Sequence, residues 1–235
     1  MVRHMQLGDV RIELVRKPIR NLHLSVYPPI GRVRIAAPER ATDESIRLFA
    51  ISKIGWIKRQ QGKLRTQERE SPRQYIERES HYVWGRRYLL RVIERDAPPR
   101  IELTPRRLVL GIRPGTSREH RRQVMEAWYR RQLRVAVPPL VEKWQKTLRV
   151  QTNRVFIQRM KTRWGGSNPE TKNIRLNTDL AKKPVECLEY IVLHEITHLR
   201  VPRHDAAFVA LLDRSLPNWR ESRDRLNRLP ISSDR

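Results

Sequence analysis

The chain has 235 residues, of which 38% are hydrophobic, so it can bury a core as one domain or as two small ones. No run of about 18 uncharged apolar residues occurs, and the first residues lack the apolar stretch of a signal peptide. We therefore expect a cytoplasmic protein that does not enter a membrane. A single cysteine, Cys187, excludes an intrachain disulfide framework and agrees with a reducing compartment.

The formal net charge of +25 at pH 7 is the strongest bulk property. Repulsion on that scale is usually relieved by a polyanionic partner, for which DNA or RNA is the natural candidate. An acidic protein partner or an acidic peptide substrate would satisfy the same electrostatics. A solvated arginine-rich surface remains the alternative, because no helix-turn-helix, zinc-finger or RNP motif is visible. The oligomeric state stays open.

Residues 8–38 alternate polar and apolar side chains between proline and glycine turns. This pattern predicts three short strands in an antiparallel meander. Thr42 or Asp43 can cap the helix that follows. The inner face of that helix is expected to carry Ile46, Phe49, Ala50, Ile54 and Ile57. Residues 58–73 are polar and charged, which is typical of a helix end or a linker.

A second β-rich stretch covers residues 80–113 and is expected to form a hairpin or small sheet that continues the first one. Thr116 or Ser117 then begins a long amphipathic helix that reaches about residue 148. Pro138-Pro139 should kink or split this helix, because proline removes a backbone donor and clashes with the preceding turn.

The last third of the chain begins with two predicted strands, at residues 154–160 and 173–176. A glycine-rich turn is expected between them at residues 164–166. Asp179 is interpreted as the cap of the helix that follows. We find no internal sequence repeat or low-complexity tract.

Residues 190–208, YIVLHEITHLRVPRHDAAF, carry the clearest chemical signal. His194 and His198 are four residues apart, so on a helix both imidazoles lie on one face and can bind one metal ion. Glu195 is rotated by about 100° from His194. Its carboxylate can therefore lie beside the ion without binding it and can accept a proton from the attacking water.

A catalytic zinc ion needs a third protein ligand and one open position. His204 is the nearest candidate, because Pro202 ends or redirects the helix and lets the chain fold back. Tyr190 is a candidate oxyanion donor by its position alone. Asp213 is a candidate acceptor for an imidazole N–H group.

The same segment allows two other interpretations. Its aliphatic residues would also form a buried helix that holds no metal. A purely structural zinc site is usually closed by four cysteine or histidine ligands, and Cys187 lies seven residues before His194. We expect Cys187 to be a small buried apolar residue instead.

Several motifs occur in a fixed order: Trp164-Gly165, Arg175-Leu176-Asn177, the HEITH helix, and His204 with Phe208 four residues later. In this order, residues 161–219 resemble the catalytic core of the YgjP-like metallopeptidases, zincin-type proteins related to the SprT-like metalloproteases. The segment RNLHLSVYPPIGRVRIAAP and residues 54–57 also resemble the family, so most of the chain is covered. One departure is Gly166-Ser167, where relatives more often carry Ser-Cys; the metal site is unaffected.

This resemblance implies an α+β fold. We expect an N-terminal antiparallel β-rich region, residues 1–115, and a helical, zincin-like catalytic region, residues 116–235, unless the two form one continuous domain. The sheet beside the active helix is expected to align an extended peptide through backbone hydrogen bonds.

The implied activity is that of a zinc-dependent metallopeptidase. Zn²⁺ would be bound by His194, His198 and His204, and Glu195 would be the general base that hydrolyses the peptide bond with metal-activated water. One alternative is a basic nucleic-acid-associated protein whose zinc site is idle or regulated. Others are a protease that acts on DNA-bound proteins, as the related SprT-like proteins do, and a hydrolase of non-peptide amides.

Overall fold

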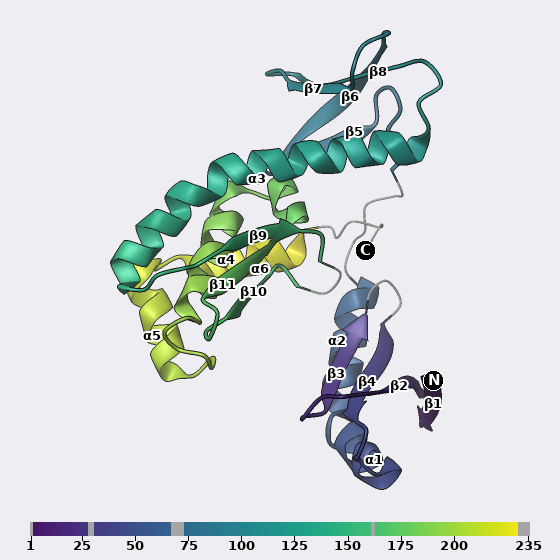
Figure 1. Cartoon of the computed structure of the whole chain (residues 1–235), viewed down its shortest axis with the longest axis vertical. Coiled ribbons are helices and arrows are strands. Elements are labelled where there is room, and N and C mark those ends of the chain that lie inside the picture. The colour runs from purple at the N-terminus through teal and green to yellow at the C-terminus, as the bar shows by residue number, and fades with distance from the viewer. Residues whose placement is uncertain (1, 28–30, 67–72, 161–162, 230–235) are drawn as a thin grey trace. The chain divides into compact units, whose positions relative to one another are not determined.

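The computed structural model describes residues 2–27, 31–66, 73–160 and 163–229 (Figure 1). They fall into two compact units, the described residues up to 66 and those from 73 to 229. Each unit has a hydrophobic core of its own. The strands between residues 80 and 112, which the sequence placed in the N-terminal region, share the core of the second unit.

The described part of the first unit forms one sheet and two helices. The elements are β1 (Val2–Leu7), β2 (Val10–Lys17), β3 (His23–Tyr27), β4 (Arg32–Pro38), α1 (Asp43–Ser52) and α2 (Ile54–Thr66). The Thr42 side chain caps α1 by accepting a hydrogen bond from the Ser45 backbone N–H, at 3.2 Å, as the sequence predicted. Side chains of both helices, including Ile46 and Ile57, are fully buried in the core of this unit.

The predicted antiparallel meander is wrong in one pairing. The strand order is β1-β2-β4-β3, and β2 pairs with β4 in parallel, with Ile12 opposite Val33. The burial pattern explains this order. Buried residues recur at every second position along much of β2 and β4, whereas β3 has no buried residue. The two apolar strands therefore lie in the centre of the sheet, and β3 takes an edge.

The described part of the second unit forms two sheets and the remaining helices. Its elements are β5 (Ser80–Val83), β6 (Arg86–Glu94), β7 (Arg100–Leu103), β8 (Arg107–Ile112), α3 (Arg118–Leu148), β9 (Val155–Gln158), β10 (Gly165–Asn168), β11 (Asn173–Asn177), the 3-10 helix η1 (Thr178–Lys182), α4 (Val185–Thr197), α5 (Ala206–Ser215) and α6 (Trp219–Arg228). The β-rich stretch predicted at residues 80–113 is present. It forms a separate sheet and does not continue the first one.

The first two sheets repeat one topology. The order β5-β6-β8-β7 has antiparallel outer pairs and a parallel central pair, as the order β1-β2-β4-β3 does. Both sheets are followed by helix. This structural repeat was not visible in the sequence, because strand pairing depends on alternating burial and not on residue identity.

Helix α3 contributes its buried side chains to the core of the second unit. Ser117 caps it by accepting from the His120 N–H at 3.3 Å, and the helix runs unbroken through Pro138 and Pro139. Of the predicted kink or split, the split does not occur, and both prolines lie on the exposed side. The buried stripe of α3 shares one core with α4 and with the sheet β5–β8, and Figure 1 shows α3 running past both.

The turn between β5 and β6 supports the start of α4. The Trp84 N–H donates to the Ala181 carbonyl at 2.9 Å. Gly85 has a φ of +78°, and a Cβ atom there would lie 2.7 Å from the Pro184 Cγ. Only glycine accepts both this backbone conformation and this close approach. The sheet β5–β8 is thereby fixed to the residue that precedes α4.

The fold class is α+β, as expected, with mostly antiparallel pairings and helices that cover the sheets. None of the helices in the described ranges is long and apolar enough to cross a bilayer.

Candidate active site

Helix α4 positions the HEITH residues. It is apolar on nearly every side, and Leu188, Val192 and Ile196 are fully buried, so tertiary packing fixes its rotation. The helix ends at Thr197, with His198 as its C-cap. The break therefore comes earlier than Pro202, where the sequence placed it.

The chain then folds back into α5. The Asp205 side chain caps α5 by accepting a hydrogen bond from the Phe208 N–H at 3.0 Å. His204 directly precedes this cap. The capped start of α5 thus fixes the position of the third histidine next to the two histidines of α4.

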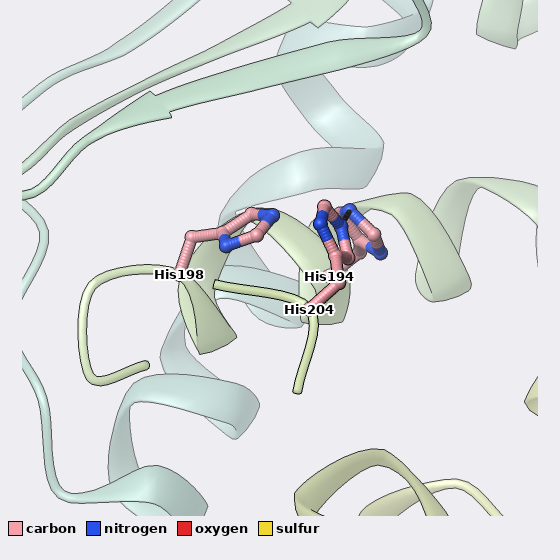
Figure 2. Close-up of side chains that lie close together, drawn as sticks. All are labelled: His194, His198 and His204. Atoms are coloured by element: carbon pink, nitrogen blue, oxygen red, sulfur yellow. Dashed lines mark hydrogen bonds between the residues drawn. The ribbon is translucent and has the colours of Figure 1, made fainter. Parts of the chain in front are cut away.

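The three predicted ligands converge in space. One ring nitrogen from each of His194, His198 and His204 lies within 4.8 Å of the other two. The Nε2 atoms of His194 and His204 are 3.1 Å apart, and Figure 2 shows these two rings close together with His198 beside them. Two nitrogens bound to one tetrahedral zinc at about 2.0–2.1 Å would be separated by roughly 3.3 Å. The spacing of the His194 and His204 nitrogens therefore fits a zinc ion, and His198 lies close enough to offer a third nitrogen.

Neighbouring groups orient these rings. The Nδ1 atom of His198 lies 3.3 Å from the Val201 carbonyl oxygen, which assigns the proton to Nδ1 and leaves Nε2 for a metal. The Tyr190 hydroxyl lies 3.5 Å from Nδ1 of His194. The buried Phe208 ring packs against all three imidazoles, with ring centroids 4.7 to 5.0 Å away.

The histidines of α4 are held in the neutral form that binds metals. Burial, together with the neighbouring His198 and His204, lowers the pKa of His194 to about 3. Burial and the charge of His204 also lower the pKa of His198. A neutral imidazole offers a free lone pair, so no proton has to be displaced before an ion binds.

Glu195 lies against β10 and is only 5% exposed. A Cβ atom on Gly165 would lie 2.5 Å from its Oε1 atom, so only a glycine leaves room for this carboxylate. The Ser167 hydroxyl donates a hydrogen bond to it. Burial raises the pKa of the Glu195 carboxyl to about 7, against the opposing effects of Ser167 and of the Arg163 charge.

The sequence did not assign a role to Gly165 or Ser167. It predicted a turn at residues 164–166, whereas residues 165–168 form the strand β10. Residues two apart on a strand share a face, so both residues can face Glu195. The only feature of the sequence that could have indicated these contacts is the presence of two small residues, Gly165 and Ser167, at alternate positions.

A cleft of about 590 Å³ contains Glu195 and the three histidines. One wall is formed by residues 163–169 and another by residues of α6. The space above the histidines is therefore open to a ligand of peptide size, with Trp164 among the lining residues.

Other predicted roles are changed by the structure. Asp213 accepts a hydrogen bond from the Trp219 Nε1–H at 2.8 Å and pairs with Arg220, so it is engaged by α6. Asp179 forms an ion pair with Lys182, and the cap of η1 is Asn177. The Tyr190 hydroxyl lies near Nδ1 of His194 and Tyr190 lines the cleft, so its role as oxyanion donor stays a prediction. Cys187 is fully buried, as expected.

Comparisons with known proteins identify the family. A family model described as "YgjP-like, metallopeptidase domain" matches residues 20–229. Two crystal structures of metallopeptidase zymogens, Pyrococcus abyssi abylysin and Methanocaldococcus jannaschii jannalysin, match at 24% identity over 37% of this chain and 89% and 84% of theirs, with TM-scores of 0.35 and 0.34. No curated protein gives a significant match. Because the family model covers most of its length, the chain belongs to the YgjP-like metallopeptidases and is a metal-dependent peptidase.

Proposed function

We propose that the protein is a zinc-dependent peptidase in which His194, His198 and His204 hold Zn²⁺ and Glu195 is the general base. One observation carries this proposal. Three imidazoles from α4 and the following loop converge beside a buried carboxylate within a single open cleft.

The three imidazole donors and the one carboxylate have different roles in the proposed reaction. The three imidazoles would hold the ion, and zinc bound there would supply Lewis-acid polarisation of the scissile carbonyl and would lower the pKa of water. Glu195 accepts the proton of the attacking water and passes it to the leaving amine. Its contacts with β10 hold the carboxylate in place for both transfers.

The substrate is proposed to bind along β10. Among the described residues, β10 is an outer strand of the order β10-β11-β9, and residues 165–167 also line the cleft. An outer strand presents backbone N–H and C=O groups on one side. An extended peptide can add to this edge as a further strand and place its scissile bond over the histidines.

His204→Ala tests the metal assignment. Loss of a residue that only hydrogen-bonds to a metal ligand weakens metal binding roughly 10–100-fold. Removing a ligand itself should weaken zinc binding by more than that. Titration calorimetry with zinc and elemental analysis measure this, and peptide hydrolysis should fall in parallel and stop when a chelator is added. His120→Ala is the matched control, because His120 is exposed on α3 and lies outside the cluster. A zinc affinity in His204→Ala equal to that of the wild type would show that His204 is not a ligand.

One observation favours DNA or RNA binding as a second candidate function. A hollow of about 530 Å³ at the C-terminal end of α3 is lined by Lys146, Arg149 and Lys172, and its described lining contains no carboxylate. Cations in such a hollow can neutralise phosphates. Duplex and single-stranded DNA binding should then weaken steeply with salt, and replacing the three cations by Gln should reduce the slope by about 0.9 per lost contact. A flat salt response would contradict this function.

A further inference from the structure

The walls of the active cleft have an unbalanced charge. Its ionisable side chains, apart from Tyr190, are the three histidines, Arg163, Arg223 and Glu195. Glu195 is the sole carboxylate in this described lining, and its side chain is buried against β10. A substrate that enters the cleft therefore meets two guanidinium groups and no exposed carboxylate.

Arg223 is held in place by aromatic contacts. Its guanidinium lies 5.1 Å from the centroid of the Trp219 ring. Trp219 stacks on Tyr190, with centroids 5.9 Å apart and an interplanar angle of 15°, and Tyr190 packs against His194. This row of rings fixes Arg223 with respect to the three histidines.

The guanidinium of Arg223 can still exchange its partner. It pairs with Asp224 at 3.0 Å, and the side chains are 43% and 53% exposed. An ion pair with this exposure contributes little to stability, because water screens both charges. A substrate carboxylate in the cleft can therefore compete with Asp224 for a bidentate contact.

Arg163 provides the second charge from the other wall. It lies two residues before β10, and its backbone carbonyl accepts a hydrogen bond from the Asn177 amide at 2.8 Å. Within the described ranges, its guanidinium forms no ion pair with a carboxylate. Its charge acts on Glu195 without a direct ion pair, so its guanidinium can still bind a ligand carboxylate.

We propose that this cleft selects acidic peptides, with Arg163 and Arg223 binding Asp or Glu side chains on either side of the scissile bond. The inference rests on the proposed peptidase function of the same site. The net charge of +25 acts in the same direction, because a positive surface attracts acidic chains before they bind.

The first experiment compares matched fluorogenic peptides on the zinc-loaded full chain. The peptides are amidated and differ only by Glu, Gln or Lys at the residues that flank one bond. We expect kcat/KM to be roughly tenfold higher for Glu than for Gln, lowest for Lys, and the difference to shrink as salt rises. A second set with free C-termini separates side-chain recognition from recognition of a terminal carboxylate. A preference that appears only with free C-termini would overturn the proposal.

The second experiment assigns the preference to the two arginines. Arg223→Gln and Arg163→Gln should each lower the Glu/Gln ratio of kcat/KM, and Arg223→Glu should shift the preference towards Lys peptides. Arg228→Gln is the matched control, because Arg228 is exposed on the same helix and does not line the cleft. Unchanged ratios in both cleft variants would overturn the proposal.

The selectivity and the proposed peptidase function can fail separately. Equal cleavage of Glu and Gln peptides would leave the peptidase function intact and refute the preference. If the wild-type protein cleaves no peptide, the peptidase function fails, and the preference is then decided by binding. Labelled Glu peptides should bind the zinc-loaded Glu195→Gln variant roughly tenfold more tightly than Gln peptides in fluorescence anisotropy. Equal dissociation constants would refute the preference.

Discussion

Glu195→Gln is expected to keep zinc and to lose roughly 10²–10⁴-fold in kcat, the range that general acid–base catalysis contributes. The amide has the size of the carboxylate and can occupy the space beside Gly165. It can accept the hydrogen bond from Ser167, so the local structure is retained. It cannot take a proton from water at neutral pH. Steady-state kinetics and elemental analysis of zinc on the same preparation measure the two effects.

The control for this variant lies on the same helix. Glu189 also belongs to α4, but it pairs with Lys143 at 2.6 Å and does not line the cleft. Glu189→Gln removes the same charge and should retain kcat within about twofold, since loss of an exposed ion pair has a small effect. Hydrolysis at the wild-type rate in Glu195→Gln would refute the assignment of the base.

The histidine cluster could be predicted because its geometry is nearly local. The separation of His194 and His198 is about one helical turn, so any helix places both rings on one face. His204 required only a chain reversal after the helix, and the VPRHD segment contains Asp205, which caps the next helix directly after it. The exact end of α4, at Thr197 and not at Pro202, was not predicted.

The rest of the site depends on contacts between distant segments. The parallel pairing of β2 with β4 and the separation of the second sheet follow from competition between strands for the centre of a sheet, which periodicity does not report. Asp213 was a plausible partner for an imidazole by its place in the chain. In the structure it binds Arg220 and Trp219, because the start of α6 lies beside α5.

Gly165→Ala is expected to lower kcat on the order of 10²-fold, the cost of misplacing a catalytic group by about 1 Å. Gly165 lies in a strand with an ordinary backbone conformation, so alanine is acceptable to the chain itself. The added Cβ would lie 2.5 Å from Oε1 and 2.8 Å from Cγ of Glu195, and the carboxylate must move away. Zinc content and the melting temperature should stay close to those of the wild type.

The neighbouring glycine is the control for this substitution. A Cβ on Gly166 would meet nothing closer than the Met160 Cε at 4.0 Å. Gly166→Ala therefore adds the same methyl group to the same strand without touching the carboxylate. It should leave kcat nearly unchanged, so a comparable loss in both alanine variants would point to damage of the strand instead.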